Sequence, residues 1–260
     1  MKVHFTEPYL LNPPHQVTID LIGMGGTGSQ VLTNLGRLHS TLINLGHPGL
    51  HVRCWDDDVV SASNIGRQLF SFADLHTNKA IILVSRLNSF YGTDWQAIPE
   101  KFEPVLPKEL SNITITCVDT AAARIEIDHL LKPMNSANNN DSHFTNKPFY
   151  WLDLGNLQKT GQLILGTVGK IKQPHSENYE PVGSLANVIK KFPEIKKIKE
   201  KDQGPSCSLA EAIKKQDLFI NSTLATFGAD LLWKLFREGM LTYHGAYINL
   251  NSFTVNPIKI

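Results

Sequence analysis

The stretch that most constrains the fold covers residues 17–38. A short apolar segment, residues 17–22, ends at Gly23, and the turn sequence GMGGTGS then leads directly into a helical pattern. Strand, glycine turn and helix form the opening unit of nucleotide-binding α/β domains, because glycines let backbone N–H groups approach phosphate oxygens and the helix N-terminus adds partial positive charge. A tight turn without a ligand has the same pattern, so residues further along the chain must decide between the two.

In the first half of the chain, strand-like and helix-like patterns alternate. This alternation predicts a Rossmann-like α/β fold, with a mostly parallel sheet flanked by helices and additional C-terminal strands. No regular pattern is found in residues 170–206, which contain four prolines and a lysine-rich run. The predicted strands are residues 17–22, 50–55, 95–102, 113–118, 149–154, 162–168, 243–250 and 253–255, and the predicted helices are residues 29–45, 79–88, 121–131, 209–215 and 218–237.

Composition excludes several classes of protein. Of the 260 residues, 42% are hydrophobic and 19% charged, which suits a large core, and the net charge of +1 argues against nucleic acid as a partner. The chain shows neither a signal peptide nor an apolar run long enough for a membrane, so we expect a soluble, cytoplasmic protein. Three cysteines without a CxxC pair argue against a disulfide framework and against a four-cysteine zinc site.

Polar residues follow three of the predicted parallel strands. The glycine turn at residues 23–28, the acidic residues Asp56 and Asp58, and Asp119 all stand where a strand ends. Carboxyl ends of parallel strands meet at one edge of a sheet, where ligands bind. Asp56 can accept hydrogen bonds from ribose hydroxyls, which both NAD and ATP possess.

The segment after Asp56 distinguishes between these two nucleotides. It supplies two amides, Asn64 and Gln68, and the cation Arg67, with Lys79 following. A redox cofactor has no use for this group, whereas the cations can offset charge on a triphosphate and on a leaving pyrophosphate.

Asp119 is predicted to hold Mg²⁺ between phosphates through its carboxylate oxygens. The alternative is that Asp119 caps the helix of residues 121–131. Thr120 can supply that cap and leave Asp119 for the metal.

With GMGGTGS, DDDVVSASNIGRQ (residues 56–68), Lys79 and Asp119, the sequence resembles the ThiF/MoeB/HesA group and the adenylating domains of ubiquitin-activating E1 enzymes. The resemblance implies binding of ATP and Mg²⁺, and adenylation of the C-terminal carboxylate of a small β-grasp, ubiquitin-like protein. It also implies one domain over residues 1–260, with a nucleotide-binding half (17–135) and a partner-binding half (147–260) that includes an irregular crossover (170–207). The implied nucleotide-binding residues are Gly23, Gly25, Gly26, Thr27, Gly28, Asp56, Asp58, Asn64 and Gln68, and the implied catalytic residues are Arg67, Lys79, Asp119 (also the metal ligand) and Cys207.

Cys207 lies in GPSCSLAEA, before a predicted helix. Similar family members use a crossover cysteine for a thioester or for sulfur transfer, while the alternative is a small residue at a helix start. The PSCSLAEA…QDLFIN segment and the chain length further resemble the ThiF-related proteins of the PRTRC cassette.

The family resemblance also implies a homodimer. Homodimeric relatives supply an arginine from an N-terminal segment to the phosphates, but no arginine precedes Arg37 here, and the zinc-binding CxxC pairs of the family are missing too. Two other functions stay open: a scaffold that binds nucleotide without catalysis, and, with less support, an NAD-dependent oxidoreductase.

Overall fold

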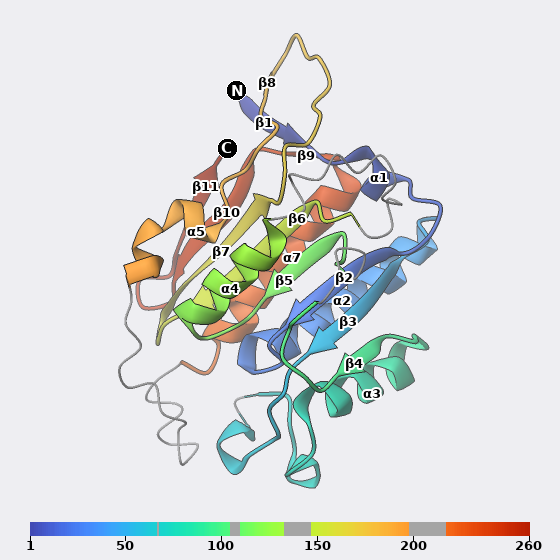
Figure 1. Cartoon of the computed structure of the whole chain (residues 1–260), viewed down its shortest axis with the longest axis vertical. Helices are drawn as coiled ribbons and strands as arrows, with labels where there is room; N and C mark the ends of the chain where they lie inside the picture. The colour runs from blue at the N-terminus through green and yellow to red at the C-terminus, as the bar shows by residue number, and fades with distance from the viewer. Residues whose placement is uncertain (67, 105–109, 133–146, 198–216) are drawn as a thin grey trace.

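The computed structural model describes residues 1–66, 68–104, 110–132, 147–197 and 217–260 (Figure 1). Arg67, Cys207 and the predicted helix of residues 209–215 lie outside these ranges, so their predicted roles stay predictions.

An eight-stranded sheet forms the centre of the molecule. Its strand order is β11-β10-β7-β6-β5-β2-β3-β4. The five strands from β6 to β4 run parallel, and β7, β10 and β11 are joined to them by antiparallel pairings. This confirms the predicted mostly parallel sheet with added C-terminal strands. The strands are β2 (Val17–Ile22), β3 (Leu50–Trp55), β4 (Gln96–Ile98), β5 (Ile113–Thr116), β6 (Tyr150–Asn156), β7 (Thr160–Thr167), β10 (Tyr243–Asn249) and β11 (Thr254–Lys259).

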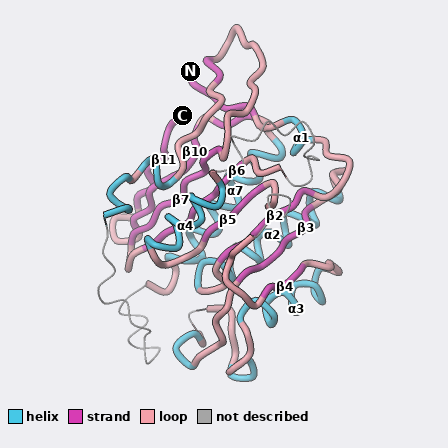
Figure 2. Tube along the Cα trace, in the orientation of Figure 1, coloured by secondary structure: helices cyan, strands magenta, loops and turns pink. Residues whose placement is uncertain are grey.

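Helices cover both faces of this sheet (Figures 1 and 2). One face packs against α2 (Gly26–Asn44), α3 (Lys79–Tyr91) and α7 (Ile220–Arg237). The other face packs against α4 (Ala121–Leu131) and the short α5 (Val188–Lys191). Each buried set forms its own hydrophobic cluster, as expected for a three-layer α/β domain.

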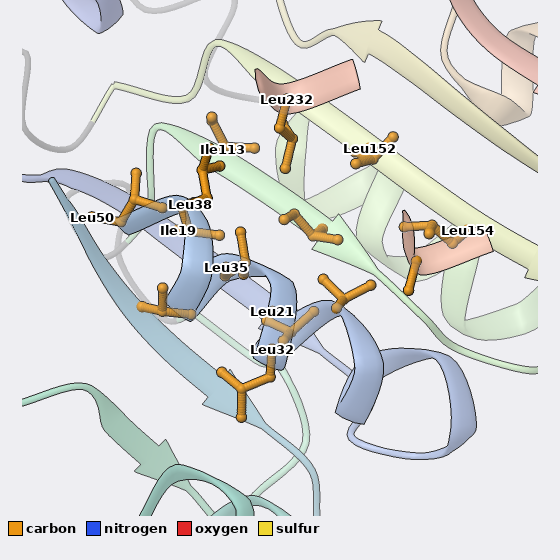
Figure 3. Packing of buried hydrophobic residues seen from close by; sticks show 14 of the residues in the cluster. Ile19, Leu21, Leu32, Leu35, Leu38, Leu50, Ile113, Leu152, Leu154 and Leu232 are labelled. Carbon is orange, nitrogen blue, oxygen red and sulfur yellow. The ribbon is translucent and has the colours of Figure 1, made fainter. Parts of the chain in front are cut away.

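The larger cluster explains why α2 lies where it does. The apolar residues of α2 recur at helical spacing. Three of them, Leu32, Leu35 and Leu38, point toward Ile19 and Leu21 of β2 (Figure 3). Leu232 of α7 and Leu152 and Leu154 of β6 complete the same layer. Burying one such leucine stabilises the fold by about 1.5–3 kcal/mol, so this face fixes α2, and therefore the turn before it, to the sheet.

The structure adds elements that the sequence pattern did not predict. A small second sheet, ordered β8-β1-β9, joins β1 (Lys2–Phe5), β8 (Glu180–Pro181) and β9 (Met240–Leu241). The stretch predicted to be irregular contains β8, α5 and a 3-10 helix at Pro193–Lys197. Segments this short do not repeat often enough to show a period, which is why they escaped prediction. The remaining short helices are α1 (Pro8–Leu11), η1 (Ala62–Asn64) and η2 (Phe72–Asp74).

In the part of the chain that the structure describes, no helix has both the length and the apolar character needed to cross a bilayer.

Candidate active site

The sheet reverses its direction of growth beside β2. From β2 the chain proceeds to β3 and β4 on one side, and then returns to place β5 and β6 on the other side of β2. Ligands of open α/β sheets bind in the crevice outside the carboxyl ends of the strands at such a reversal. The glycine turn leaves β2 at this point.

Two glycines close the turn against its neighbours. Gly23 has a φ of +87°, its N–H donates to the Trp55 carbonyl at 2.9 Å, and a Cβ there would lie 2.9 Å from the Cys117 carbonyl oxygen. A Cβ on Gly28 would lie 1.8 Å from the carbonyl oxygen of Gly23. The turn therefore requires glycine at both positions, and it touches the ends of both β3 and β5.

Gly25, unlike Gly23 and Gly28, borders open space. Its φ is −77°, and the nearest atoms to a Cβ placed there are the side-chain amide atoms of Gln68, at 4.0 Å. Gly26 begins α2, whose first helical hydrogen bond runs from the Ser29 N–H to the Gly25 carbonyl at 3.0 Å. The N–H groups of Gly26, Thr27 and Gly28 thus precede that bond and have no partner within the helix. The Thr27 hydroxyl is engaged elsewhere, because it donates to Oδ1 of Asn221 at 2.9 Å.

Gln68 faces this open space from the loop after β3. The residue is 8% exposed, and its Oε1 is a buried oxygen without a hydrogen-bond partner among the described residues. Its backbone N–H donates to the Asn64 carbonyl at 2.9 Å. An unsatisfied buried carbonyl costs about 1–3 kcal/mol, and a ligand hydroxyl or amino group at this place would remove that cost.

Asn64 stabilises the loop that carries Gln68 through hydrogen bonds to Ser61. Its side-chain oxygen accepts hydrogen bonds from the N–H and the hydroxyl of Ser61, at 2.9 and 3.0 Å, which forms a capping box around η1. The backbone bond between the Gln68 N–H and the Asn64 carbonyl joins both residues within the same loop.

Asp56 ties the end of β3 to the glycine turn. Its Oδ2 accepts from the Met24 N–H at 2.5 Å, and its Oδ1 accepts from the Asp58 N–H at 2.9 Å. Burial raises the pKa of the Asp56 carboxyl above its ordinary value, while the positive charge of Lys79 and these two N–H bonds oppose the rise. The contribution of Met24 could not be read from the sequence, since it comes from a backbone N–H.

Lys79 reaches the same edge from the first turn of α3. Its ammonium group is largely buried and pairs with Oδ2 of the exposed Asp58 at 2.7 Å. The helix start is held by Asn78, whose side chain accepts from the Ile81 N–H at 3.1 Å and donates to the Asp56 carbonyl at 2.8 Å. Lys79 and Asp56 therefore belong to one connected group.

Asp119 stands exposed after β5. Thr120 is the N-cap of α4 and accepts from the Ala123 N–H at 3.2 Å, so Asp119 is not needed as a cap. Among the described residues, no hydrogen-bond partner of the Asp119 carboxylate is found. A second group of carboxylates, from Asp56, Asp57 and Asp58, has oxygen atoms within 4.8 Å of one another, but exposed acidic groups of this kind are common without a metal.

Cys117 lies outside the observed strand, although a strand was predicted over residues 113–118. The strand β5 ends at Thr116, and Cys117 lies just beyond it, partly buried against the glycine turn. Burial raises the pKa of its thiol. Cys54, by contrast, is fully buried in β3.

A buried ion pair beside Asp119 was missed by the sequence analysis. Nε of Arg124 donates to both carboxylate oxygens of Asp153, at 2.9 and 3.1 Å, and both residues are less than 10% exposed. Thr116 donates its hydroxyl to the same carboxylate at 2.6 Å. The available signal was an arginine at a core-facing position of the predicted helix 121–131.

A hollow of about 300 Å³ lies at the same edge of the sheet, over its antiparallel part. Its lining includes Thr160, Gln162, Tyr247 and Asn256, from the beginning or the body of β7, β10 and β11. It is separate from the glycine turn.

Comparison with known proteins gives one family and several similar folds. A family model described as the ThiF family matches residues 14–255. PaaA is similar at a TM-score of 0.56 and 14% identity, over 94% of this chain and 64% of PaaA. Escherichia coli MccB is similar at a TM-score of 0.54 and 16% identity, over 96% of this chain and 63% of MccB, and MccB together with MccA gives a TM-score of 0.54 at 15% identity, over 96% and 64%.

This chain spans less than two thirds of the length of those structures. At such identities the likeness shows the fold, which is again a mixed α/β domain. No curated protein sequence matches the chain.

Proposed function

This chain belongs to the ThiF family, and we propose that it is an ATP-dependent adenylyltransferase that activates the C-terminal carboxylate of a small ubiquitin-like protein. One observation carries the proposal: the open space at Gly25 is bordered by the unsatisfied buried oxygen of Gln68, at the sheet edge that also holds Asp56, Lys79 and Asp119. This combination of a glycine cradle, an acceptor and charged groups suits ATP better than it suits a redox cofactor.

Each residue has a role that follows from its chemistry. Asp56 accepts hydrogen bonds from the ribose hydroxyls, next to Gln68. The first N–H groups of α2, at Gly26, Thr27 and Gly28, face the phosphates, and Lys79 contributes positive charge to them. Arg67 is proposed to add a second cation, and Asn64 and Asp58 act by holding Gln68 and Lys79.

Asp119 is proposed to hold Mg²⁺, since its carboxylate is exposed and is not needed as the helix cap. When bound, the ion would offset negative charge on the phosphates.

The adenylation step itself requires positioning and charge stabilisation, and no covalent bond to the enzyme forms in it. A carboxylate oxygen of the partner forms a bond to the α-phosphorus of ATP. The bond between that phosphorus and the bridging oxygen breaks, and pyrophosphate leaves with the electron pair. The products are the acyl adenylate and pyrophosphate.

The partner is proposed to be a β-grasp protein whose C-terminal tail reaches the site. The hollow over β7, β10 and β11 lies at the same sheet edge and offers backbone and side-chain groups to an extended tail. The structure of MccB, which has a similar fold, has been solved together with MccA.

We further propose that the protein is cytoplasmic, forms a homodimer and is a ThiF protein of the PRTRC type. In this proposal Cys207 takes the acyl group after adenylation, or takes part in sulfur transfer.

The first test is calorimetric titration with ATP and Mg²⁺, ATP and EDTA, and NAD. We expect ATP to bind more tightly with Mg²⁺ and NAD not to bind. Binding of NAD alone would favour an oxidoreductase. Magnesium-dependent ATP binding without pyrophosphate exchange, in the presence of β-grasp partners encoded nearby, would favour the scaffold.

The substitution Asp119→Ala tests the metal role. We expect it to abolish ATP–pyrophosphate exchange and to leave the melting temperature within about 2 °C, because an exposed side chain that has no partner among the described residues contributes about 0.5 kcal/mol or less to stability. The matched control is Glu126→Ala, which removes an exposed carboxylate from α4. Exchange that survives in Asp119→Ala as it does in Glu126→Ala would exclude the metal role.

A further inference from the structure

Arg124 makes contacts that go beyond its ion pair with Asp153. Nη2 donates to the Val118 carbonyl at 2.7 Å, and Nη1 donates to the Thr120 carbonyl at 3.1 Å. These two carbonyls belong to the residues on either side of Asp119. One guanidinium group thus holds the backbone both before and after the exposed carboxylate.

Hydrogen bonds to the central sheet fix the guanidinium group through Asp153. Asp153 lies opposite Thr116 in the pairing of β5 with β6, and the Thr116 hydroxyl, which donates to Asp153, accepts in turn from the Trp151 indole N–H at 2.8 Å. These groups are nearly inaccessible to solvent. The network therefore runs from the sheet core to the loop without a water-exposed link.

The sheet also leaves room for this side chain. A Cβ on Gly155 of β6 would lie 2.6 Å from Nε2 of Gln162 and 2.8 Å from Nη2 of Arg124. Nη2 is the atom that donates to Val118, so a side chain at position 155 would press on that hydrogen bond. Glycine at position 155 therefore leaves the space that the guanidinium group occupies.

We propose that Arg124 is a positioning residue, which fixes the backbone around Asp119 and so holds its carboxylate where a nucleotide-bound Mg²⁺ requires it. Mg²⁺ demands near-ideal octahedral geometry at about 2.0–2.1 Å, so a ligand on a loosely held loop binds it poorly. Arginine suits the task because its planar group donates in several fixed directions at once, whereas lysine carries the charge on a single nitrogen. The inference rests on the proposed function, since it assigns Asp119 to the metal.

The test compares Arg124→Lys with Arg53→Lys. Both substitutions keep a positive charge beside a buried carboxylate, because Arg53 pairs with Asp20 through two bonds of 2.8 Å. Among the contacts described, Arg53 makes none with residues 117–120. Full removal of Arg124 would leave Asp153 buried without a counter-charge and risks unfolding, so lysine is the informative replacement.

Two measurements separate positioning from general stability. In the ligand-free protein, we expect Arg124→Lys, and not Arg53→Lys, to speed hydrogen exchange of the backbone amides in residues 117–123. With ATP present, we expect Mn²⁺ binding, followed by its electron paramagnetic resonance signal, to weaken about tenfold or more in Arg124→Lys alone. Gly155→Ala should produce the same pair of changes in milder form, with Asp153 still paired.

The possible outcomes separate the positioning role of Arg124 from the proposed function on which it rests. If the wild type binds ATP with Mn²⁺ and Arg124→Lys binds the ion as well as Arg53→Lys does, the positioning role is overturned and the proposed function stands. If the wild type shows no metal-dependent ATP binding, the proposed function is overturned and the positioning role with it. Unchanged exchange in residues 117–123 would also overturn the positioning role.

Discussion

Asp56, which we propose binds the ribose, lies where burial disfavours the ionised form of its carboxyl. Burial raises the pKa of its carboxyl, and the N–H groups of Met24 and Asp58 and the charge of Lys79 only partly offset that effect. An ionised carboxylate in this place is an acceptor whose remaining oxygen sites are suited to ribose hydroxyls. Gln68 likewise has an acceptor for a ligand, because its buried Oε1 has no hydrogen-bond donor among the described residues.

The raised pKa predicts how Asp56 contributes to stability as the pH changes. The native state takes up the Asp56 proton at a higher pH than the unfolded chain, whose carboxyl titrates near 3.8. As the pH falls from neutral toward 3.8, the wild type should therefore gain unfolding free energy relative to Asp56→Asn, which does not titrate there. Denaturant unfolding of both proteins at several pH values measures this difference.

The opposite slope would be equally informative. If the wild type loses stability relative to Asp56→Asn as the pH falls, the pKa in the fold is lowered. The N–H bonds and Lys79 would then outweigh burial.

The location of the candidate residues was only partly predictable from sequence. Asp56 and Asp119 were expected near each other because strand ends meet at one edge of a parallel sheet, and the structure places both at that edge, while their ligand roles stay predictions. The link from Arg124 to the backbone around Asp119 could not, because it depends on side-chain direction and on the free space at Gly155. The same holds for the bond between the Thr27 hydroxyl and Asn221, which joins residues far apart in the chain.

At the scale of elements, the glycine turn contains positions with different physical demands. Gly28 is required by packing, since a Cβ there would overlap the carbonyl oxygen of Gly23. Among the described residues, no atom lies nearer than 4.0 Å to a Cβ placed on Gly25, whose φ is negative, so this part of the protein has room for a side chain. A ligand-binding role is the reason we offer for glycine at position 25.

The pair Gly25→Ala and Gly28→Ala tests this distinction. We expect Gly28→Ala to lower the unfolding free energy by about 3 kcal/mol or more, because the turn must move. Gly25→Ala should cost less than about 1 kcal/mol and weaken ATP binding about tenfold or more, since its methyl group enters the proposed phosphate site. Chemical denaturation and calorimetry give the two quantities.

Normal ATP affinity in Gly25→Ala would contradict the proposed phosphate site at this turn. A stable Gly28→Ala would show instead that the turn can relax away from Gly23.

The longer elements were predicted well, and their ends less well. Strands β2 and β3 and helix α4 have the predicted bounds, because each is bordered by a glycine, a proline or a cluster of polar residues. Helix α2 begins at Gly26 and not at Ser29, since glycines at a helix start carry no sequence signal of helix. The three-stranded sheet escaped because its strands come from distant parts of the chain and have between two and four residues each.

At the scale of the whole molecule, the site is part of the central sheet and not an appendage. The turn after β2 bonds to the end of β3 and packs on the end of β5, while α2 fixes it to the core through Leu32 and Leu35. A ligand bound here contacts groups that are brought together only when the sheet is formed. Binding should therefore be coupled to global unfolding.

This coupling predicts a ligand-dependent rise in melting temperature. At a concentration of 100 times Kd, a ligand that binds only the native state adds about 2.7 kcal/mol of stability. For a chain near this size, about 1 kcal/mol corresponds to about 2–4 °C, so ATP with Mg²⁺ should raise the melting temperature by about 5–10 °C. Thermal unfolding followed by intrinsic fluorescence measures the shift, with Asp119→Ala and NAD as the comparisons.

The size of the shift in Asp119→Ala identifies which part of the site supplies it. With ATP and Mg²⁺ the shift should fall in this variant to the value that the wild type shows with ATP and EDTA, because the glycine turn, Asp56 and Gln68 would still hold the nucleoside. An equal shift with Mg²⁺ and with EDTA in the wild type would remove the metal from the site. No shift at all, at ATP concentrations up to the millimolar range, would overturn the proposed function, because the described groups at this sheet edge would then hold no nucleotide.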